Sequence, residues 1–291
     1  MKPEGAGHEP VMVDEVIRFL AGRGTVLDLT LGAGVHAEAL LASGVQLLVG
    51  VDRDPEAVRL AAERLASFGP RFRAVTARFS QMPAENRVDG VLFDLGVSSL
   101  QLDRPERGFS YREGGPLDMR MGGEEEGTTS AREIVGSAPE EELARIIHEY
   151  GDERRSRRVA AALVRARSRA PIETTDELAR VVAGAVGRRR GGPHPARRTF
   201  QALRIAVNRE LEELAASLPR AVGILAPGGR VVVIAYHSLE DRIVKRFFLD
   251  APELEVLTGK PLRPRAAEAA RNPRSRSARL RCAQRIAPVE A

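Results

Sequence analysis

The sequence has no tryptophan, a single cysteine and only three lysines among its 291 residues. With Cys282 alone the chain cannot form an internal disulfide framework, which fits a reducing compartment. No apolar run reaches the roughly 18 residues that a membrane-spanning helix needs. The first ten residues lack the charged-then-apolar layout of a secretion signal. These absences predict a cytoplasmic protein without a membrane segment.

Because lysine is so scarce, arginine supplies nearly all of the positive charge. The formal net charge of +5 and the isoelectric point of about 9.9 attract polyanions weakly. Arginine can clamp a phosphate through two parallel hydrogen bonds and can stack on bases. A high arginine content also follows from a GC-rich genome or from adaptation to heat. Only the distribution of arginine along the chain can therefore support a functional interpretation.

The positive charge gathers in two stretches of the chain. Residues 105–151 hold 5 basic and 11 acidic side chains, whereas residues 152–198 hold 13 basic and 5 acidic ones. Between Lys260 and Arg285 there are nine basic residues and one acid, Glu268. Such runs most often form a solvated face, so their presence alone does not establish a binding surface.

Five short apolar runs, each ending in polar or glycine residues, predict buried parallel strands. They are Thr25–Leu31, Gln46–Asp52, Phe72–Ala77, Val88–Asp94 and Arg230–Tyr236. Helical patterns follow the first two strands, at His36–Leu41 and Pro55–Phe68, and Asp54 is the expected N-cap of the second helix. This alternation predicts an α/β fold with a Rossmann-like, doubly wound sheet.

The interval between the fourth and fifth strands is far too long for one crossover. Its last part, Phe200–Leu225, predicts one amphipathic helix that returns the chain to the sheet. The rest of the interval predicts an inserted all-α subdomain. The predicted domains are residues 1–104 with 199–291 for the sheet and residues 105–198 for the insertion.

Three further elements are expected after the fifth strand. The pattern predicts a helix at Leu239–Leu249, a strand at Leu254–Thr258 and a final strand in ARLRCAQRI, residues 278–286. A terminal strand pair around a basic linker suits a sheet whose last strand runs antiparallel to the others.

The stretch VLDLTLGAGVHAEAL, Val26–Leu40, runs from a strand through a glycine turn into a helix. Gly32 to Ala37 satisfies G-x-G-x-x-A, the dinucleotide fingerprint, which is a weak signal on its own. Glycines let the backbone approach a ligand, and the start of a helix offers unpaired N–H groups. Asp52, which lies 20 residues after Gly32, is placed to bind a ribose. These features fit both a nicotinamide dinucleotide and S-adenosylmethionine.

Asp28, inside the first strand, separates these two cofactors. Its carboxylate would repel a pyrophosphate but would favour an ammonium next to a sulfonium. The alternative is that Asp28 only caps or hydrogen-bonds the turn. We therefore predict S-adenosylmethionine as the cofactor, with Asp28 and Gly32 as further candidates for contacting it.

Two more positions follow the strands of the predicted sheet. Phe79 comes just after the third strand, where it could cover an adenine or simply pack in the core. Asp94 ends the fourth strand, at the carboxyl edge where ligands of open α/β sheets bind. The polar, glycine-rich run Asp94–Met121 predicts a loop whose polar groups face a ligand.

Four stretches of the sequence resemble the bacterial small-subunit rRNA cytosine N4-methyltransferase family, known as RsmH or MraW. The matching stretches are HEPVMVDEV (His8–Val16), DLGVSSLQLDRPERGFSYREGGPLDMRM (Asp94–Met121), AYHSLEDRIVKRFF (Ala235–Phe248) and NPRSRSARLR (Asn272–Arg281). They extend over nearly the full chain, and together they are highly specific. The resemblance implies a class I methyltransferase fold with a helical insertion, and a product resembling N4-methylcytidine in the decoding region (P site) of 16S rRNA.

The resemblance also implies which residues contact the cofactor. This sequence departs from the family at Val35, where the family usually has a second glycine before the histidine. A contact made through backbone atoms survives this change if φ at Val35 stays negative. The implied contacts are Gly34, Val35, His36, Asp52, Phe79, Asp94 and Gln101.

The expected reaction sets clear demands on the site. The exocyclic amine of cytosine is a poor nucleophile, so it must be aligned with the methyl group while acceptors hold its N–H groups. Asp94, Ser98 and His237 are the candidate catalytic residues, with Ser99 and Ser238 as further acceptors. No His/Cys cluster has the spacing of a metal site, so we expect no metal ion.

The expected partner is 16S rRNA, within the small ribosomal subunit. Phe109 or Tyr111 could stack on the extruded base, or could instead pin the loop to the protein body. The basic half of the insertion and the Lys260–Arg285 segment are expected to bind RNA phosphates. A nicotinamide-dependent dehydrogenase, an inactive RNA-binding assembly factor, and a DNA or protein methyltransferase are the competing hypotheses.

Overall fold

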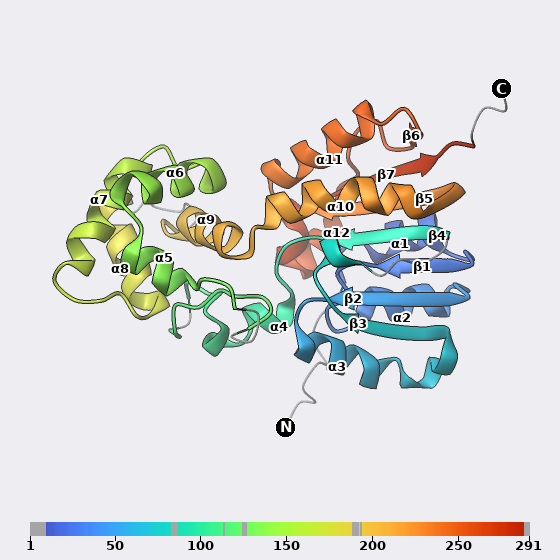
Figure 1. Ribbon diagram of the computed structural model, residues 1–291, viewed down its shortest axis with the longest axis horizontal. Helices are drawn as coiled ribbons and strands as arrows, with labels where there is room; N and C mark the ends of the chain where they lie inside the picture. Colours follow the sequence, from blue (N-terminus) through green and yellow to red (C-terminus); the bar gives the residue numbers. More distant parts are fainter. Residues whose placement is uncertain are drawn as a thin grey trace. The chain divides into compact units, whose positions relative to one another are not determined.

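A computed structural model describes residues 10–82, 87–112, 114–123, 127–187, 192 and 194–287 of the chain. The chain divides into two compact units. We call Met1–Gly96 together with Leu211–Ala291 the sheet unit, and Val97–Glu210 the helical unit (Figure 1). The chain therefore leaves the sheet unit once and returns to it once.

The sheet has seven strands in the part of the chain that the structure describes. They are β1 (Thr25–Asp28), β2 (Leu47–Asp52), β3 (Phe72–Thr76), β4 (Val88–Asp94), β5 (Leu225–Ala235), β6 (Leu254–Val256) and β7 (Arg279–Arg285). Their order is β3-β2-β1-β4-β5-β7-β6, and β7 runs antiparallel to both of its neighbours. The other neighbouring strands pair in parallel. The predicted parallel sheet with an antiparallel last strand is confirmed.

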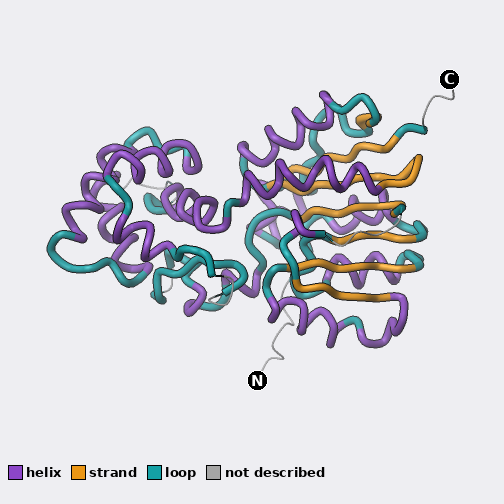
Figure 2. The backbone as a smooth tube through the Cα atoms, viewed as in Figure 1, coloured by secondary structure: helices purple, strands orange, loops and turns teal. Residues whose placement is uncertain are grey.

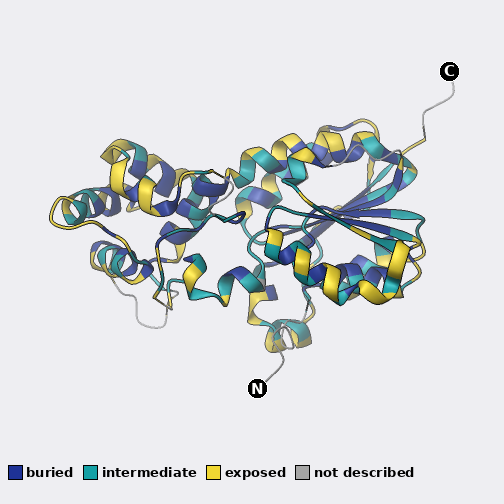
Figure 3. Cartoon of the chain, turned by 60° about the horizontal axis from the view of Figure 1, so that its bottom comes forward, coloured by how far each residue is buried: buried dark blue, intermediate teal, exposed yellow. Residues whose placement is uncertain are grey.

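Alternating residues of the central strands divide the hydrophobic core between the two faces of the sheet. In β5, Val231 and Val233 join a cluster with α10 (Glu210–Ile224) and α11 (Ser238–Asp250). Val232 and Ile234 instead join a cluster on the opposite face. The helices there are α1 (Val13–Leu20), α2 (Val35–Ala42) and α3 (Pro55–Arg64). Figure 3 shows buried strands between helices whose outer faces are exposed.

Local capping fixes where α3 begins. Asp54 accepts a hydrogen bond from Glu56 N at 3.1 Å and Pro55 is the first residue of α3, as the sequence predicts.

The predicted helix at Leu239–Leu249 is confirmed as α11, which lies between β5 and β6. A short helix, α12 (Ala266–Arg271), precedes β7. None of the described helices is long and apolar enough to cross a membrane.

The helical unit has its own hydrophobic core. Its helices are α4 (Ser99–Leu102), α5 (Ala131–Ser137), α6 (Glu140–Gly151), α7 (Ser156–Arg167), α8 (Thr175–Val186) and α9 (Arg197–Asn208) (Figure 2). Leu143 and Ile147 of α6, Val159 of α7, Leu178 of α8 and Leu203 of α9 are fully buried in one cluster. A separate core of this size means that the unit does not depend on the sheet for its packing.

One expected helix is wrong in its extent. The pattern predicts a single helix over Phe200–Leu225, but the structure has α9 and α10, which are separated at Arg209. Arg209 has φ +52°, a left-handed conformation that ends α9. The division between the two units falls at this break, so that α9 packs in the helical unit and α10 on the sheet. The helical unit therefore extends further at both ends than the predicted 105–198.

Candidate active site

The turn between β1 and α2 depends on two glycines. Gly32 and Gly34 have φ of +51° and +77°, which L side chains rarely adopt. A Cβ atom at Gly34 would also lie 3.1 Å from Ala61 Cβ and 3.1 Å from Leu65 Cδ1. The turn thus needs glycine both for its conformation and for the close approach of α3.

Val35 is the first residue of α2 and is not among the described residues with positive φ. The condition set for a backbone contact at Val35 is therefore met, while the contact itself remains a prediction. No side chain caps the helix at Gly34, so the backbone N–H groups of its first turn remain able to bind a ligand.

Asp52, at the carboxyl end of β2, holds the same turn from the side. Its Oδ2 accepts a hydrogen bond from Gly32 N at 2.8 Å, and its Oδ1 accepts one from Asp54 N at 2.9 Å. Burial raises the pKa of Asp52 to about 6, against the opposing effect of these two bonds. Each carboxylate oxygen keeps a second lone pair, which can accept a hydrogen bond from a ribose hydroxyl.

Asp28, at the carboxyl end of β1, is only 1% exposed. Its Oδ1 accepts a hydrogen bond from Thr30 N at 3.1 Å, whereas its buried Oδ2 has no hydrogen-bond partner. Burial raises the pKa of Asp28 to about 7, and the nearby His36 opposes this rise. The hydrogen bond from Asp28 to the turn is thus present, but it satisfies only Oδ1. A cationic ligand at this edge of the sheet would compensate the charge on Oδ2.

Asp94, at the carboxyl end of β4, is the centre of a polar cluster. Tyr236 donates a hydrogen bond from its hydroxyl to Asp94 Oδ1 at 2.8 Å. The backbone N–H of Asp94 donates to Thr30 Oγ1 at 2.6 Å, which links the ends of β1 and β4. The Asp94 side chain is 22% exposed, and burial raises its pKa above the usual range. The carboxylate is thus fixed in orientation and still accessible.

His36 joins the same cluster from the first turn of α2. Its Nε2 lies 2.9 Å from Val11 O, and its Nδ1 lies 3.5 Å from Asp94 Oδ2. A carbonyl only accepts, so this contact places a proton on Nε2. The alternative role predicted for His36 was a hydrogen bond to a neighbouring backbone group. The structure contains that bond and also places His36 next to Asp94.

Phe79 is half-buried just beyond β3, and its ring meets Phe93 edge-on at a centroid distance of 5.9 Å. It packs at the border of the core on the α10 side of the sheet. The core role is therefore present, while the adenine contact remains a prediction.

His237 caps α11. Its Nδ1 accepts a hydrogen bond from Glu240 N at 3.4 Å, and Glu240 Oε2 accepts bonds from the backbone N–H groups of Tyr236 and His237. The His237 Nε2 lies 3.1 Å from Glu240 Oε1. The capping box commits Nδ1, whereas the buried Nε2 makes no hydrogen bond, and the catalytic role expected for His237 remains a prediction.

Ser98 and Gln101 belong to the helical unit and bond to each other around α4. Gln101 Oε1 accepts from Ser98 N at 3.1 Å, and Ser98 Oγ accepts from Gln101 N at 3.2 Å. Gln101 is 4% exposed. The roles expected for these two side chains remain predictions.

The aromatic pair of the rim segment lies within the helical unit. Phe109 is 6% exposed in the core cluster. Tyr111 stacks on His194 at 4.8 Å and meets Phe200 edge-on. These contacts fit the second interpretation, in which the aromatics fix the loop.

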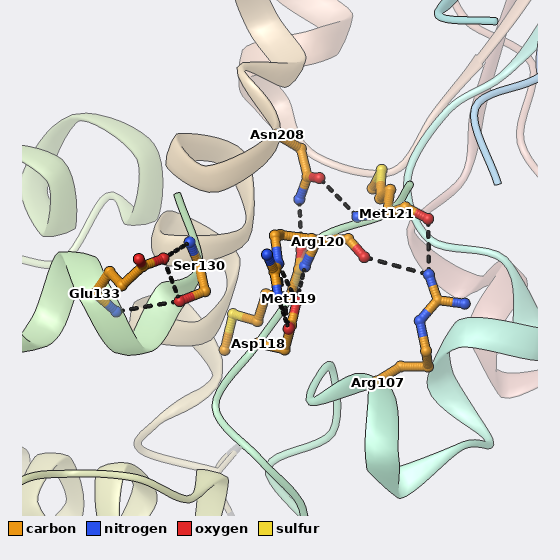
Figure 4. Close-up of polar contacts among 8 residues, drawn as sticks. All are labelled: Arg107, Asp118, Met119, Arg120, Met121, Ser130, Glu133 and Asn208. Atoms are coloured by element: carbon orange, nitrogen blue, oxygen red, sulfur yellow. Dashed lines mark hydrogen bonds and ion pairs between the residues drawn. The ribbon is translucent and has the colours of Figure 1, made fainter. Parts of the chain in front are cut away.

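A second polar cluster holds this loop in the helical unit (Figure 4). Asn208 donates from Nδ2 to Met119 O at 2.8 Å and accepts at Oδ1 from Met121 N at 2.9 Å. Arg107 Nη2 donates to Met121 O at 2.7 Å. Arg120 donates to both carboxylate oxygens of Asp118. Burial raises the pKa of Asp118, but the hydrogen bonds and the charge of Arg120 outweigh it and hold this pKa below its usual range. Many polar groups at the end of the Asp94–Met121 segment, which was expected to face a ligand, thus form hydrogen bonds within the helical unit.

Thr30 and Tyr236 were not predicted as site residues. Both follow the carboxyl end of an observed strand, β1 and β5 respectively. Tyr236 ends the predicted strand Arg230–Tyr236, so the signal that singled out Asp94 would have found it, whereas Thr30 lies inside the predicted strand Thr25–Leu31.

Comparison with known proteins gives a consistent assignment. The family model of the MraW methylase family matches residues 5–286. Ribosomal RNA small subunit methyltransferase H of Methylobacterium sp. (strain 4-46) is 51% identical, covering 97% of this chain and 91% of that protein. The proteins of the same name from Geobacter sulfurreducens and Saccharopolyspora erythraea are 48% and 46% identical; the matches cover 96% of this chain in both cases and 99% and 93% of those proteins.

The residues at the sheet edge fit S-adenosylmethionine. The helix start at Gly34 has backbone N–H groups that a ligand could use, and Asp52 has carboxylate lone pairs that could accept from a ribose. An ionised Asp28, whose Oδ2 has no hydrogen-bond partner, would favour a sulfonium over a pyrophosphate. The match over nearly the whole chain decides the class. This protein belongs to the MraW methylase family and is an S-adenosylmethionine-dependent methyltransferase.

Proposed function

We propose that this enzyme acts in the cytoplasm and methylates the exocyclic N4 amine of a cytidine in the decoding region (P site) of 16S rRNA. The observation that carries the proposal is the Asp94 carboxylate, which is oriented by Tyr236 and lies next to His36 at the carboxyl edge of the sheet. Family membership and the names of the relatives support rRNA of the small subunit as the substrate.

The chain's own residues hold the cofactor in this proposal. Gly34, Val35 and His36 provide the first turn of α2, Asp52 binds the ribose, and Phe79 borders the adenine. Asp28 acts through its charge because its side chain is almost fully buried. Bound S-adenosylmethionine supplies an electrophilic methyl group. We propose Gln101 as a further contact from the helical unit.

Asp94 accepts a hydrogen bond from the substrate amine in the proposed reaction. Its Oδ1 is held by Tyr236, which leaves Oδ2 to align an N–H group of the cytosine. As the N–CH₃ bond forms and the S–CH₃ bond breaks, the amine nitrogen becomes acidic. Asp94 Oδ2 then takes the proton, for which its raised pKa is suited.

Two further residues support Asp94 in the proposal. We assign Ser98 the role of a second acceptor for the amine, because its Oγ keeps a lone pair beyond the bond from Gln101 N. We assign His237 a positioning role. Through Glu240 it fixes the backbone of Tyr236, and Tyr236 in turn orients Asp94.

The decisive experiment incubates the enzyme with methyl-labelled cofactor and one of three substrates: under-methylated 30S subunits, naked 16S rRNA or DNA. The RNA is then digested, and the labelled nucleoside is identified by chromatography and mass spectrometry. We expect N4-methylcytidine from 16S rRNA, mapped by nuclease fragments to the decoding region. Label on C5, on a ribose oxygen or on protein would overturn the proposal.

A further inference from the structure

The helical unit carries a surface of arginines with free guanidinium groups. Arg158 and Arg165 lie on α7, while Arg154 and Arg169 flank it, and all four are exposed. Within the described residues, none of these guanidinium groups has a hydrogen-bond or ion-pair partner. Arg157, also on α7, shares this property and is exposed as well. We call these five residues the α7 surface.

The α7 surface faces away from the core. The buried residues Val159, Ala160 and Leu163 define one side of α7. At 100° per residue, Arg158 and Arg165 project from the opposite side, and their seven-residue separation spans about 10 Å along the helix. Arg158 and Arg165 therefore lie in one line along the outer side of α7.

The position of these charges is unfavourable for the folded protein alone. The first turn of α7 contains no acidic residue and begins after Arg154 and Arg155, where the helix dipole disfavours cations. In the same unit, α5, α6 and α8 all have acidic residues in their first turns. An anionic partner would compensate this effect.

The other basic stretch, Lys260–Arg285, is used differently. Arg279 and Arg281 both pair with Asp241, at 3.7 and 2.7 Å. Arg265 pairs with Asp14, and Arg285 donates to Leu225 O at 2.5 Å. Arg276 donates to Ala269 O at 3.0 Å. These five side chains are held within the sheet unit, while Lys260 and Arg263 are exposed and have no partner within the described residues. Most cations of this segment are therefore less available to RNA than those of the α7 surface.

We infer that the α7 surface binds the phosphate backbone of the rRNA substrate, and that the Lys260–Arg285 segment contributes little to this binding. The inference rests on the proposed function and names the residues that recognise its substrate. Arginine suits this role because its planar group clamps phosphate oxygens in pairs. Phosphate contacts of this kind position the RNA without reading its sequence.

The test compares two triple variants with the same change in charge. The first, R158E/R165E/R169E, reverses the α7 surface. The matched control, R242E/K245E/R246E, reverses three exposed cations on α11 that likewise have no partner within the described chain. Anisotropy titrations with a labelled 16S rRNA fragment across a salt series give Kd and its salt dependence, and calorimetry gives the affinity for S-adenosylmethionine.

We expect the first variant to raise the Kd for rRNA at least about tenfold and to lower the slope of log K against log salt by about two to three. We expect the control to change Kd by about threefold or less, through net charge alone. Cofactor affinity and the thermal midpoint should stay unchanged in both. The neutral variant R158Q/R165Q/R169Q should lie between wild type and the reversal.

Three results would overturn the inference. Equal weakening by both triple variants would mean that overall charge, and not this surface, attracts RNA. An unchanged Kd in the first variant would remove the surface from binding. A raised KM for 30S subunits with an unchanged Kd for rRNA would assign it to a ribosomal protein. If the wild-type protein binds rRNA but does not methylate it, the proposed function fails. The Kd values of the two triple variants then still test whether the α7 surface binds RNA.

Discussion

The two polar clusters of the molecule differ in how fully their groups are satisfied. In the helical unit, the amide of Asn208 bonds on both its nitrogen and its oxygen side, and Asp118 is paired with Arg120 (Figure 4). In the sheet unit, Asp28 has a buried oxygen without a partner. Burial raises the pKa values of Asp28, Asp52 and Asp94, whereas the pKa of Asp118 is lowered.

This difference indicates what each cluster is for. A closed network stabilises its own loop, and removing one member leaves buried groups unsatisfied. An open network of carboxylates costs stability and keeps negative charge available for a ligand. Substitutions in the helical cluster should therefore change folding, and substitutions in the sheet cluster should mainly change activity.

The largest expected effect is on catalysis. Replacing Asp94 with Asn removes the proton acceptor but keeps its size and its bond to Tyr236. We expect kcat to fall at least about 100-fold. Single-turnover methylation of 30S subunits measures this. The control Asp250→Asn, on the exposed end of α11, should behave as wild type. Unchanged turnover in Asp94→Asn would remove this carboxylate from the chemistry.

Asn208→Ala should have the largest effect on folding. The substitution leaves Met119 O and Met121 N buried without their partner, and we expect the free energy of unfolding to fall by about 3 kcal/mol. Chemical denaturation measures the loss. The control Gln201→Ala on the same helix removes one bond, to Tyr150 O, and should cost about 1 kcal/mol. Equal losses would show that the helical cluster is not a closed network.

Gly34→Ala should destabilise the glycine turn. The new Cβ requires φ of +77° and meets Ala61 and Leu65 at 3.1 Å, so we expect a loss of about 2 kcal/mol. Gly223→Ala is the matched control, because it lies in α10 with nothing within 4 Å of the added Cβ. There the thermal midpoint should stay or rise, since alanine favours a helix by up to about 1 kcal/mol.

Asp28→Asn should separate stability from cofactor binding through pH. The folded-state pKa of about 7 lies above the ordinary aspartate pKa of 3.8, so the folded protein binds the extra proton. The stability from this group is therefore present below about pH 4 and is lost as the pH rises towards 7. Without cofactor, the variant should be more stable than wild type at pH 8 and similar to it near pH 4.

The same variant should bind S-adenosylmethionine about tenfold more weakly at pH 8, and this difference should narrow below pH 6 as Asp28 becomes protonated in wild type. Thermal melts and calorimetry over a pH series give both quantities. Lower stability of the variant at pH 8 would contradict the assignment of Asp28 to an open cluster.

The smallest expected effect belongs to Tyr236→Phe. Losing one hydrogen bond to Asp94 should lower kcat about fivefold, corresponding to about 1 kcal/mol. Because this bond lowers the pKa of Asp94, the acidic limb of the kcat–pH profile should move to higher pH. In an Asp94→Asn background the second substitution should add little, as expected of residues that act together. A full additive loss would argue for an independent role of Tyr236.

Much of the fold follows from the sequence because its signals are local. The apolar runs give the parallel strands, and Asp54-Pro55 gives the start of α3. The break between α9 and α10 could not be read in this way, because the apolar period continues through Arg209. What ends α9 is a left-handed residue next to Asn208, whose side chain bonds to a loop almost 90 positions earlier in the chain.

The positions of Asp52 and Asp94 were predictable because both residues end predicted strands, whereas Asp28 was expected inside a strand and ends β1 in the structure. The sequence could not show which side chains have partners in the folded protein. Arg279 and Arg158 are both arginines, but Arg279 pairs with Asp241, whereas the guanidinium group of Arg158 has no partner within the described residues. His237 likewise looks catalytic by position, while its ring caps α11. Such distinctions depend on partners that are distant in sequence.

Calorimetric titration of S-adenosylmethionine into the purified protein tests most directly whether the open carboxylate cluster is the cofactor site. We predict one site per chain, weakened at least about tenfold by Asp52→Ala, which removes the ribose acceptors and the bond to Gly32 N, and unaffected by R158E/R165E/R169E. Absence of binding to the wild-type chain, or equal affinity in Asp52→Ala, would contradict the account.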